Sequence, residues 1–321
     1  MNMAFIMDPP ESLNPATDTT LVLMLEAQRR GHGVYYVKPE TLAARGDAPL
    51  CSARRIRVSE PPDDAKDMSG LFRTDAPEEA NLGEMDAVWM RKDPPFDMDY
   101  VYLTHILSLA EKRGAAVINR PDAIRKSNEK LSALEFARFM PDTLVSKDTE
   151  RIEEFLAEKK KIVVKPLDGF GGEGIVRIET GADARQLIGK ATGGGRVFVM
   201  AQEFIREVSG GDKRIIMLDG EPVGAVLRLP PEGGFICNFH SGGSPAKTEI
   251  TERDREICGA LGGHLRRAGI YLAGIDIVGG MLTEINCTSP TCVREINRLE
   301  GARLESDIMD FAEDLIRRKG K

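Results

Sequence analysis

The chain has 321 residues, of which 41% are hydrophobic and 30% are charged, as is ordinary for a globular protein of about two domains. Its net charge of −7 and the lack of a basic block argue against a nucleic-acid or anionic-membrane partner. Its five cysteines include no C-x-x-C pair and its four histidines no zinc spacing, which argues against a disulfide framework or a zinc site. With no signal-peptide pattern and no membrane-length apolar run, we expect a cytoplasmic protein.

The first part of the chain alternates strand and helix patterns, which favours a parallel sheet. The patterns predict strands over 3–7, 33–39, 87–90 and 116–119, and helices over about 18–30 and 97–113. Residues 59–84 are acidic, proline-rich and weakly periodic, so we expect an exposed excursion there. These elements predict a Rossmann-like domain over residues 1–124. No glycine fingerprint follows its first strand, so dinucleotide binding is not supported there.

The second part has a different order of elements and no internal repeat. The patterns predict helices near 127–139, 148–159, 251–268 and 305–318, strands over 161–165, 175–179 and 196–205, and hairpins over 214–230 and 273–286. Asp219-Gly220 is a strong turn signal for the first hairpin. A long loop rich in Gly, Pro and Ser fills residues 231–247.

A glycine-rich segment, KPLDGFGGEGIV over 165–176, matches both a dinucleotide pattern and a kinase pattern. Neither fits, because a strand pattern follows where a dinucleotide loop needs a helix, and neither H-R-D nor D-F-G is present. The strand lysine, Lys165, also precedes the loop. A glycine hairpin can fold over phosphates and offer backbone N–H groups. The alternative is a flexible hairpin turn.

Three oxygen-bearing residues, Asp276, Glu284 and Asn286, lie in the hairpin GIDIVGGMLTEIN. Glu284 and Asn286 share one face of a strand because side chains alternate. A two-residue turn at Gly279-Gly280 would put Asp276 on the other face, so we predict a three-residue loop that unites all three. Such oxygen ligands suit Mg²⁺. The alternative is an exposed hairpin with scattered polar residues.

Three cations are spaced to complete a phosphate site. Lys130 is early in a predicted helix, Lys165 is on a strand, and Arg214 begins another strand. Each alone is as easily explained as a solvated surface charge. Together with the glycine loop and the oxygen triad, they indicate a site for a polyphosphate and a metal ion.

Several stretches, spread over nearly the whole chain, resemble the ATP-grasp enzymes and within them the bacterial glutathione synthetases. They are LEAQRRG (25–31), MRKDPPFD (90–97), NEKL (128–131), KPLDGFGG (165–172), GDKR (211–214), DGEPV (219–223) and LTEINCTSPTCVREI (282–296). The resemblance implies an α/β (α+β) chain with an ATP-grasp fold over 125–316 after the Rossmann-like substrate domain. Within that fold it implies a lid subdomain over about 125–200 and a metal and catalytic subdomain over 201–316.

The resemblance also implies residue roles. Lys130 and Lys165 would bind ATP phosphates, and the loop with Gly169, Gly171 and Gly172 would cover them. The remaining ATP contacts would be Gln202, Glu203, Phe204 and Ile205 at the adenine and Asp212 at the ribose. Asp276, Glu284 and Asn286 would hold two Mg²⁺ ions, or Mn²⁺ in their place. The catalytic set would be Arg214, Lys165 and Asn286. The substrate set would be Arg91, Arg228, Asn238, Ser289, Pro290 and Thr291.

The implied reaction joins γ-glutamylcysteine to glycine through an acyl phosphate, giving glutathione, ADP and phosphate, in a homo-oligomer (dimer or tetramer). The family loop usually carries Arg-Gly-Asn-x-Ala-x-Gly-Gly, whereas residues 236–243 are ICNFHSGG. This departure leaves open a ligase for a related γ-glutamyl or peptide acid with another amine. A non-catalytic ATP-binding regulator is the third hypothesis. Cys237 and His240 also suggest a nucleophile or a metal ligand, but we expect them to be solvent-facing loop residues.

Overall fold

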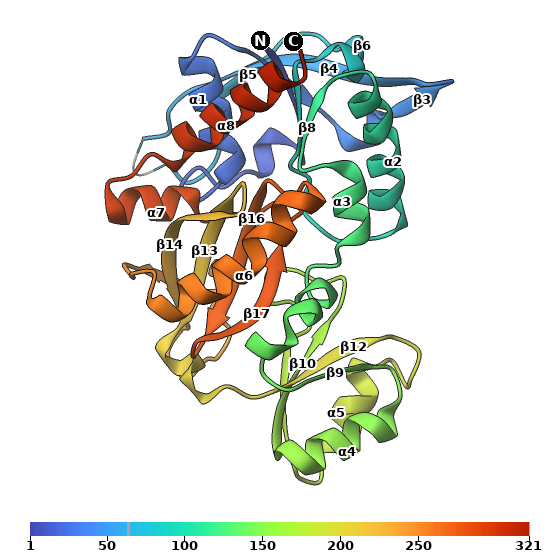
Figure 1. The fold of residues 1–321 in the computed structure, drawn as a ribbon, viewed down its shortest axis with the longest axis vertical. Helices are drawn as coiled ribbons and strands as arrows, with labels where there is room; N and C mark the ends of the chain where they lie inside the picture. Colours follow the sequence, from blue (N-terminus) through green and yellow to red (C-terminus); the bar gives the residue numbers. More distant parts are fainter. Residues whose placement is uncertain (63–64, 321) are drawn as a thin grey trace.

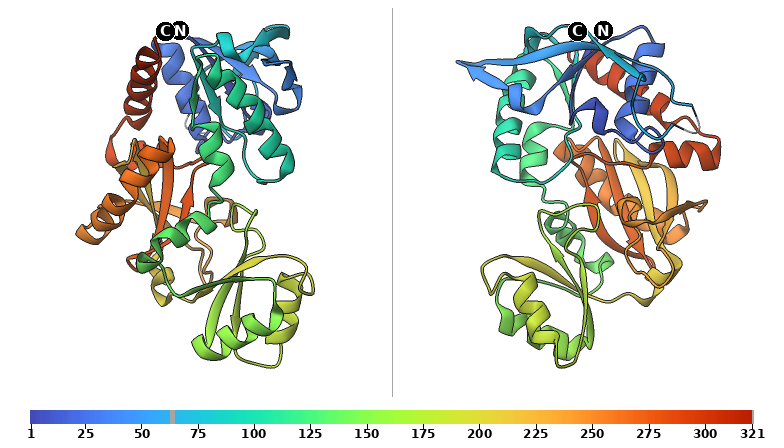
Figure 2. Two further views of the ribbon diagram at one scale, coloured as in Figure 1. Left: turned by 45° about the vertical axis from the view of Figure 1, so that its right-hand side comes forward. Right: turned by 180° about the vertical axis from the view of Figure 1, so that it is seen from behind.

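The computed structural model describes residues 1–62 and 65–320 and places three β-sheets one after another along the longest axis (Figure 1). The chain termini lie side by side at the top (Figure 1). Figure 2 shows the lowest sheet as a separate lobe with its own helices. Among the described residues, no helix combines the length and the apolar character needed to cross a membrane.

The first sheet confirms the predicted parallel arrangement, with β2, β1, β7 and β8 parallel in that order. Its strands are β1 (Asn2–Ile6), β2 (Gly33–Val37), β3 (Ala43–Arg45), β4 (Ala48–Val58), β5 (Phe72–Thr74), β6 (Glu78–Asn81), β7 (Ala87–Met90) and β8 (Ala116–Ile118). Its helices are α1 (Thr19–Arg29) and α2 (Met98–Lys112). The prediction of a loose excursion over 59–84 is wrong in part, because β5 and β6 pair with β4. Residues 63–64 lie outside the described residues.

The lowest sheet is antiparallel, in the order β11-β10-β12-β9. Its elements are β9 (Thr143–Ser146), α4 (Thr149–Lys159), β10 (Lys161–Pro166), β11 (Val176–Glu179), α5 (Ala184–Ala191) and β12 (Val199–Glu203). The helix predicted near 127–139 is replaced by two elements, α3 (Pro121–Lys126) and the 3-10 helix η4 (Leu131–Phe139). Pro121 starts α3 early because proline suits the first helical position. The Asn128 side chain then accepts the backbone N–H of Leu131 at 3.0 Å at the start of η4.

The middle sheet is antiparallel, in the order β15-β14-β13-β16-β17. Its elements are β13 (Asp212–Leu218), β14 (Glu221–Leu229), β15 (Ser244–Ala246), α6 (Glu252–Ala268), β16 (Leu272–Val278) and β17 (Met281–Asn286). One face carries apolar side chains such as Ile215, Ile275 and Ile277, which pack in the same core as Ile257 and Leu261 of α6. The opposite face is apolar near Ile216 and Val226 and polar farther along the same strands.

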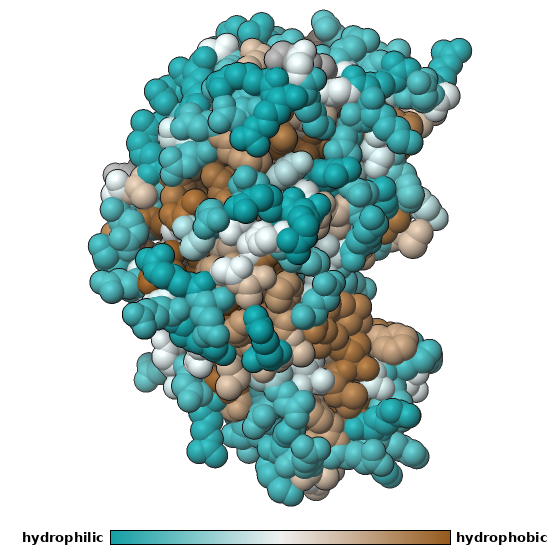
Figure 3. Space-filling view, viewed as in Figure 1, coloured by the Kyte–Doolittle hydropathy of each residue, from teal (hydrophilic) through white to brown (hydrophobic). Residues whose placement is uncertain are grey.

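The last two helices, α7 (Val293–Glu300) and α8 (Leu304–Arg318), bring the chain end back to the first sheet. Ile308, Met309 and Ile316 of α8 share one core with Phe5 and Trp89. The first and middle sheets are therefore held together by the C-terminal helices. Polar side chains cover most of the periphery in Figure 3, while apolar ones show mainly in the middle of that face.

Candidate active site

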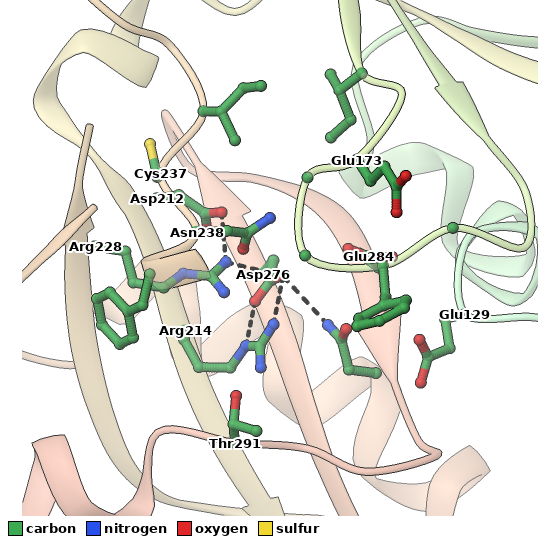
Figure 4. A pocket seen from close by; sticks show the side chains of 18 of the residues that line it. Glu129, Glu173, Asp212, Arg214, Arg228, Cys237, Asn238, Asp276, Glu284 and Thr291 are labelled. Atoms are coloured by element: carbon green, nitrogen blue, oxygen red, sulfur yellow. Dashed lines mark hydrogen bonds and ion pairs between the residues drawn. The ribbon is translucent and has the colours of Figure 1, made fainter. Parts of the chain in front are cut away.

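A cavity of about 290 Å³ is lined by strands of the lowest and middle sheets, by residues that follow β1 and β7 of the first sheet, and by nearby loops. Its centre is a charged cluster on the polar face of the middle sheet (Figure 4). We call the part formed by Arg214, Arg228, Asp276, Glu284 and Asn286 the strand end. We call the part formed by Asp18, Arg91 and Glu295 the helix end, since α1 and α7 supply both of its acids.

The strand end is built around Asp276, which faces two arginines (Figure 4). Arg214 makes a two-point contact, with Nε 2.5 Å from Oδ1 and Nη2 2.8 Å from Oδ2. Arg228 Nη2 lies 2.9 Å from Asp276 Oδ2 and 2.5 Å from Asp212 Oδ2. Burial opposes ionisation of Asp276, but the two guanidinium groups outweigh it and hold the pKa of that carboxyl well below its usual range. Burial raises the pKa of Asp212 to about 6 despite Arg228.

Strand register explains this convergence. Asp276 pairs with Arg214 on β13 and with Glu284 on β17, so the three side chains share one face. The predicted three-residue hairpin loop is wrong: Val278 pairs with Met281 across a two-residue turn. An irregularity between Asp276 and Ile277 shifts the strand register by one residue. Asp276 therefore lies on the same face as Glu284, as predicted. Gly274 also leaves room, because a Cβ there would lie 2.8 Å from Arg214 Cδ.

The oxygen triad fits a hard divalent cation. Asn286 donates its amide N–H to Asp276 Oδ2 at 3.2 Å and to the carbonyl of Gly274 at 3.1 Å, so its Oδ1 stays available. The carboxylate of Glu284 has Lys130 Nζ 3.1 Å away. Within residues 1–62 and 65–320, no group of three His, Cys, Asp or Glu side chains could hold a metal. This agrees with a set whose third ligand is an amide and whose remaining ligands would come from phosphate and water.

Two lysines connect the strand end to the glycine loop. Lys130 Nζ donates to the carbonyl of Gly169 at 2.8 Å as well as contacting Glu284. Lys165 Nζ donates to Gln202 Oε1 at 2.7 Å, and burial lowers the pKa of Lys165. Both lysines therefore line the cavity, Lys165 from β10 and Lys130 from the start of η4. A polyphosphate in the cavity would meet both ammonium groups.

The loop over 235–243 lies against the glycine loop. A Cβ at Gly172, whose φ is +89°, would lie 2.6 Å from Ile236 Cγ2. Ser241 Oγ donates to the carbonyl of Gly171 at 3.0 Å. The expectation that Cys237 faces solvent is wrong, because it is 4% exposed and its Sγ lies 3.8 Å from the carbonyl of Val208. The side chain of His240 lies outside the described residues.

The helix end contains a buried arginine, Arg91, a buried acid, Glu295, and a half-buried acid, Asp18. Arg91 follows β7 and donates from Nε to Thr20 Oγ1 and from Nη2 to the carbonyl of Pro290, both at 3.0 Å. Asp18 caps α1 by accepting the N–H of Leu21 at 2.8 Å, and burial raises its pKa to about 6. Glu295, in the first turn of α7, is 3% exposed, and burial raises its pKa to about 7.

The structure gathers nearly all the predicted site residues around the cavity. The residues that line it are Arg91, Lys130, Lys165, Gly169, Gly171, Gly172, Gln202, Glu203, Phe204, Ile205, Asp212, Arg214, Arg228, Asn238, Asp276, Glu284, Asn286, Ser289 and Thr291. Pro290 is the exception: it lies behind the wall, where its carbonyl fixes Arg91. Their individual roles stay predictions.

Sequence reasoning missed six acids of the cavity, which are Asp8, Asp18, Asp93, Glu129, Glu173 and Glu295. Glu129 Oε1 accepts the backbone N–H groups of Cys287 and Thr288 at 2.8 and 2.9 Å, which holds the segment after β17 in place. Glu129 and Glu295 both lie in stretches that carried the family resemblance, NEKL and LTEINCTSPTCVREI. These stretches were therefore a signal that could have found both acids.

The fold is that of the ATP-grasp proteins. Two solved structures share the fold: D-cycloserine synthetase DcsG matches with a TM-score of 0.66 at 16% identity, over 99% of this chain and 100% of that one. A RimK domain ATP-grasp protein from Sphaerobacter thermophilus matches with a TM-score of 0.62 at 17% identity, over 97% and 99%. The chain belongs to the prokaryotic glutathione synthetase family, whose N-terminal domain model matches residues 1–125 and whose ATP-grasp domain model matches residues 129–301.

Individual relatives agree over the full length. Glutathione synthetase of Parasynechococcus marenigrum is 42% identical over 317 residues, covering 98% of this chain and 100% of the relative. Glutathione synthetase of Nitrosomonas europaea is 41% identical over 323 residues, covering all of both chains. The chain is therefore an ATP-dependent ligase, and its family uses ATP with divalent metal ions such as Mg²⁺.

Proposed function

We propose that this chain joins γ-glutamylcysteine to glycine, consuming ATP and giving glutathione, ADP and phosphate. The observation that carries the proposal is the strand end, where Asp276 holds two arginines beside Glu284, Asn286 and two lysines. A carboxylate must approach a triphosphate in this reaction, so clustered cations and metal ligands are what the chemistry requires. The relatives with full-length similarity support the choice of substrates.

The reaction would proceed in two displacements. A carboxylate oxygen of the cysteine residue attacks the γ-phosphorus, the bond to the ADP oxygen breaks, and an acyl phosphate forms. The glycine nitrogen then attacks the acyl carbon, phosphate leaves, and the ammonium proton is lost. Lys130, Lys165 and Arg214 would hold the phosphate oxygens, because their charged nitrogens face the cavity.

Metal ions would be held by Asp276, Glu284 and Asn286, and we propose two of them. The bound ions would neutralise phosphate charge and orient the transferred group. The glycine loop and the loop over 235–243 would cover the site, since an acyl phosphate hydrolyses in water. Their contact through Ser241 and Gly171 supports closure as a pair.

A second candidate keeps the chemistry and changes the amine or the acid. It is favoured by Ile236, which lines the cavity at a position where the family usually has arginine. An apolar side chain there would not bind the carboxylate of an amino acid acceptor. The acceptor would then be another amine, or the acid a related γ-glutamyl or peptide compound.

The test is a grid of acids and amines with ATP and Mg²⁺, read by phosphate release and product mass. The acids are γ-glutamylcysteine and its close relatives, and the amines are glycine, alanine, serine and short diamines. Glutathione formed only from γ-glutamylcysteine and glycine supports the first candidate. Faster turnover of another pair supports the second, and an Ile236→Arg variant should then shift the preference toward glycine. Consumption of ATP with no acid present would contradict both.

We further propose a cytoplasmic location and a symmetric dimer or tetramer. All five cysteines are free and buried, which suits a reducing compartment. Light scattering of the purified chain would measure the oligomeric state, and a single monomer mass at micromolar concentration would contradict it.

A further inference from the structure

A second groove, of about 650 Å³, lies where α1, α7 and α8 meet (Figure 1). It shares no lining residue with the active-site cavity. Val22 and Leu25 of α1 give it an apolar part, and four arginines and three glutamates give it its charge. A groove of this volume is large enough for a small organic molecule. It is therefore a candidate site that the proposed ligation does not use.

Two of the four arginines are already paired with glutamates of the groove. Glu26 is buried, and Arg29 Nη2 and Arg303 Nη2 lie 2.6 and 2.8 Å from its carboxylate oxygens. Arg303 Nε also lies 3.3 Å from Glu305 Oε1. The charges of Arg29 and Arg303 are therefore balanced without any ligand.

The other two arginines, Arg294 and Arg298, are four positions apart on α7, so they share one face of the helix. The Arg294 side chain is 12% exposed, and its Nη2 lies 3.4 Å from the exposed carboxylate of Glu60. Its Nη1 is enclosed and has no acceptor among the residues that the structure describes. Arg298 forms no ion pair in the described part of the chain, and its Nη2 donates to the carbonyl of Ala16 at 3.4 Å. An enclosed N–H group without an acceptor costs free energy until a ligand supplies one.

We propose that this groove binds the oxyanion of a small organic acid, with Arg294 and Arg298 on its oxygens and Val22 and Leu25 against its apolar part. A guanidinium group matches carboxylate and phosphate oxygens alike, so the shared chemistry is an oxyanion joined to an apolar group. Four arginines against three glutamates leave the groove positively charged, which favours an anion. The site is independent of the proposed ligation, because its lining residues take no part in that reaction.

The experiment measures binding to the purified chain by isothermal titration calorimetry at low salt. The probes are 4-phenylbutanoate, phenyl phosphate and the neutral 4-phenylbutanamide, so the first two distinguish a carboxylate from a phosphate. At least one anion should bind at one site per chain, and the amide should bind about 10-fold more weakly than the better anion. Arg294→Gln should weaken binding of that anion about 10- to 100-fold. Arg298→Gln should weaken it about threefold, because this arginine is exposed.

Two control variants separate the groove from the active-site cavity and from general surface charge. Lys165→Met, in the cavity, and Arg255→Gln, exposed on α6, should both leave the affinity unchanged. If Arg294→Gln does not fold, Arg298→Gln at its exposed position still tests the groove.

Three results would overturn the proposal. The first is that neither anion binds, or that the amide binds as well as the anions. The second is an unchanged affinity in the arginine variants of the groove. The third is a loss of binding in Lys165→Met, which would place the anion in the active-site cavity instead.

Discussion

The two ends of the cavity differ in how their charges are balanced. At the strand end, Asp276 has two guanidinium partners and Glu284 has Lys130, so each acid faces a cation before any ligand arrives. At the helix end, Arg91 and Glu295 are buried and Asp18 is half-buried, and Arg91 bonds to a hydroxyl and a carbonyl. The difference teaches that this cavity pairs its acids with cations at the strand end, whereas Glu295 at the helix end keeps a buried oxygen without a hydrogen-bond donor among the described residues.

The largest expected effect comes from removing a charge at the strand end. Glu284→Gln should lower kcat by about 1,000-fold or more, because it removes a metal ligand and the partner of Lys130. The measurement is product formation at saturating Mg²⁺, with Glu252→Gln, exposed on α6, as the control. A variant that keeps more than a tenth of wild-type kcat would refute the metal assignment.

Arg214→Lys tests whether the two-point contact matters beyond its charge. A lysine cannot bind both oxygens of Asp276, so we expect a loss of about 100-fold in kcat with little change in the KM for ATP. The pKa of Asp276 should rise, which would move the acidic limb of the pH–rate profile upward. Arg253→Lys, an exposed exchange of the same kind, is the control. An unchanged kcat would show that the strand end needs only positive charge.

The helix end should destabilise the ligand-free chain as the pH rises. Burial raises the folded-state pKa of Glu295 from 4.5 to about 7, so its carboxyl favours folding only while it is protonated. Stability from this group is complete below about pH 4.5 and is lost as the pH rises through about 7. Glu295→Gln should therefore unfold like the wild type at pH 4 but be more stable by about 1–3 kcal/mol at pH 8.

Urea unfolding at the two pH values measures this difference. A variant less stable than the wild type at pH 8 would mean that Glu295 has a partner in the free protein. The two ends of the cavity would then no longer differ in how their acids are balanced by other groups.

Periodic segments were predictable from the sequence because their apolar pattern reflects one buried face. Helix α6 is an example, since it buries Ile257, Leu261 and Leu265 along one face. The strand over 87–90 was instead predictable as a short apolar run, and it is buried throughout. Strand β4 was missed although Cys51, Ala53 and Ile56 are buried, because alternating arginines and a proline hide its pattern. Helix α7 was missed because it is short and starts at Cys292, whose φ is +89°.

Site residues were predictable where one short sequence motif contains them. They were not predictable where segments far apart in the sequence meet at the cavity. Asp276, Glu284 and Asn286 lie in one hairpin, so strand alternation was enough to group them. The face of Asp276 depends on a register shift that no turn rule gives. Asp18 and Glu295 are 277 positions apart and meet only because α7 and α8 return to the first sheet. Sequence spacing carries no information about such a pair.

The smallest expected effect concerns the two loops that cover the strand end. Ser241→Ala removes the hydrogen bond to the carbonyl of Gly171, which is exposed and should contribute about 0.5–1 kcal/mol to closure. We expect a two- to fivefold rise in the KM for ATP, with a small increase in ATP hydrolysis without product, because water would reach the acyl phosphate more often. An unchanged KM for ATP would show that the contact between Ser241 and Gly171 does not hold the two loops closed over the strand end.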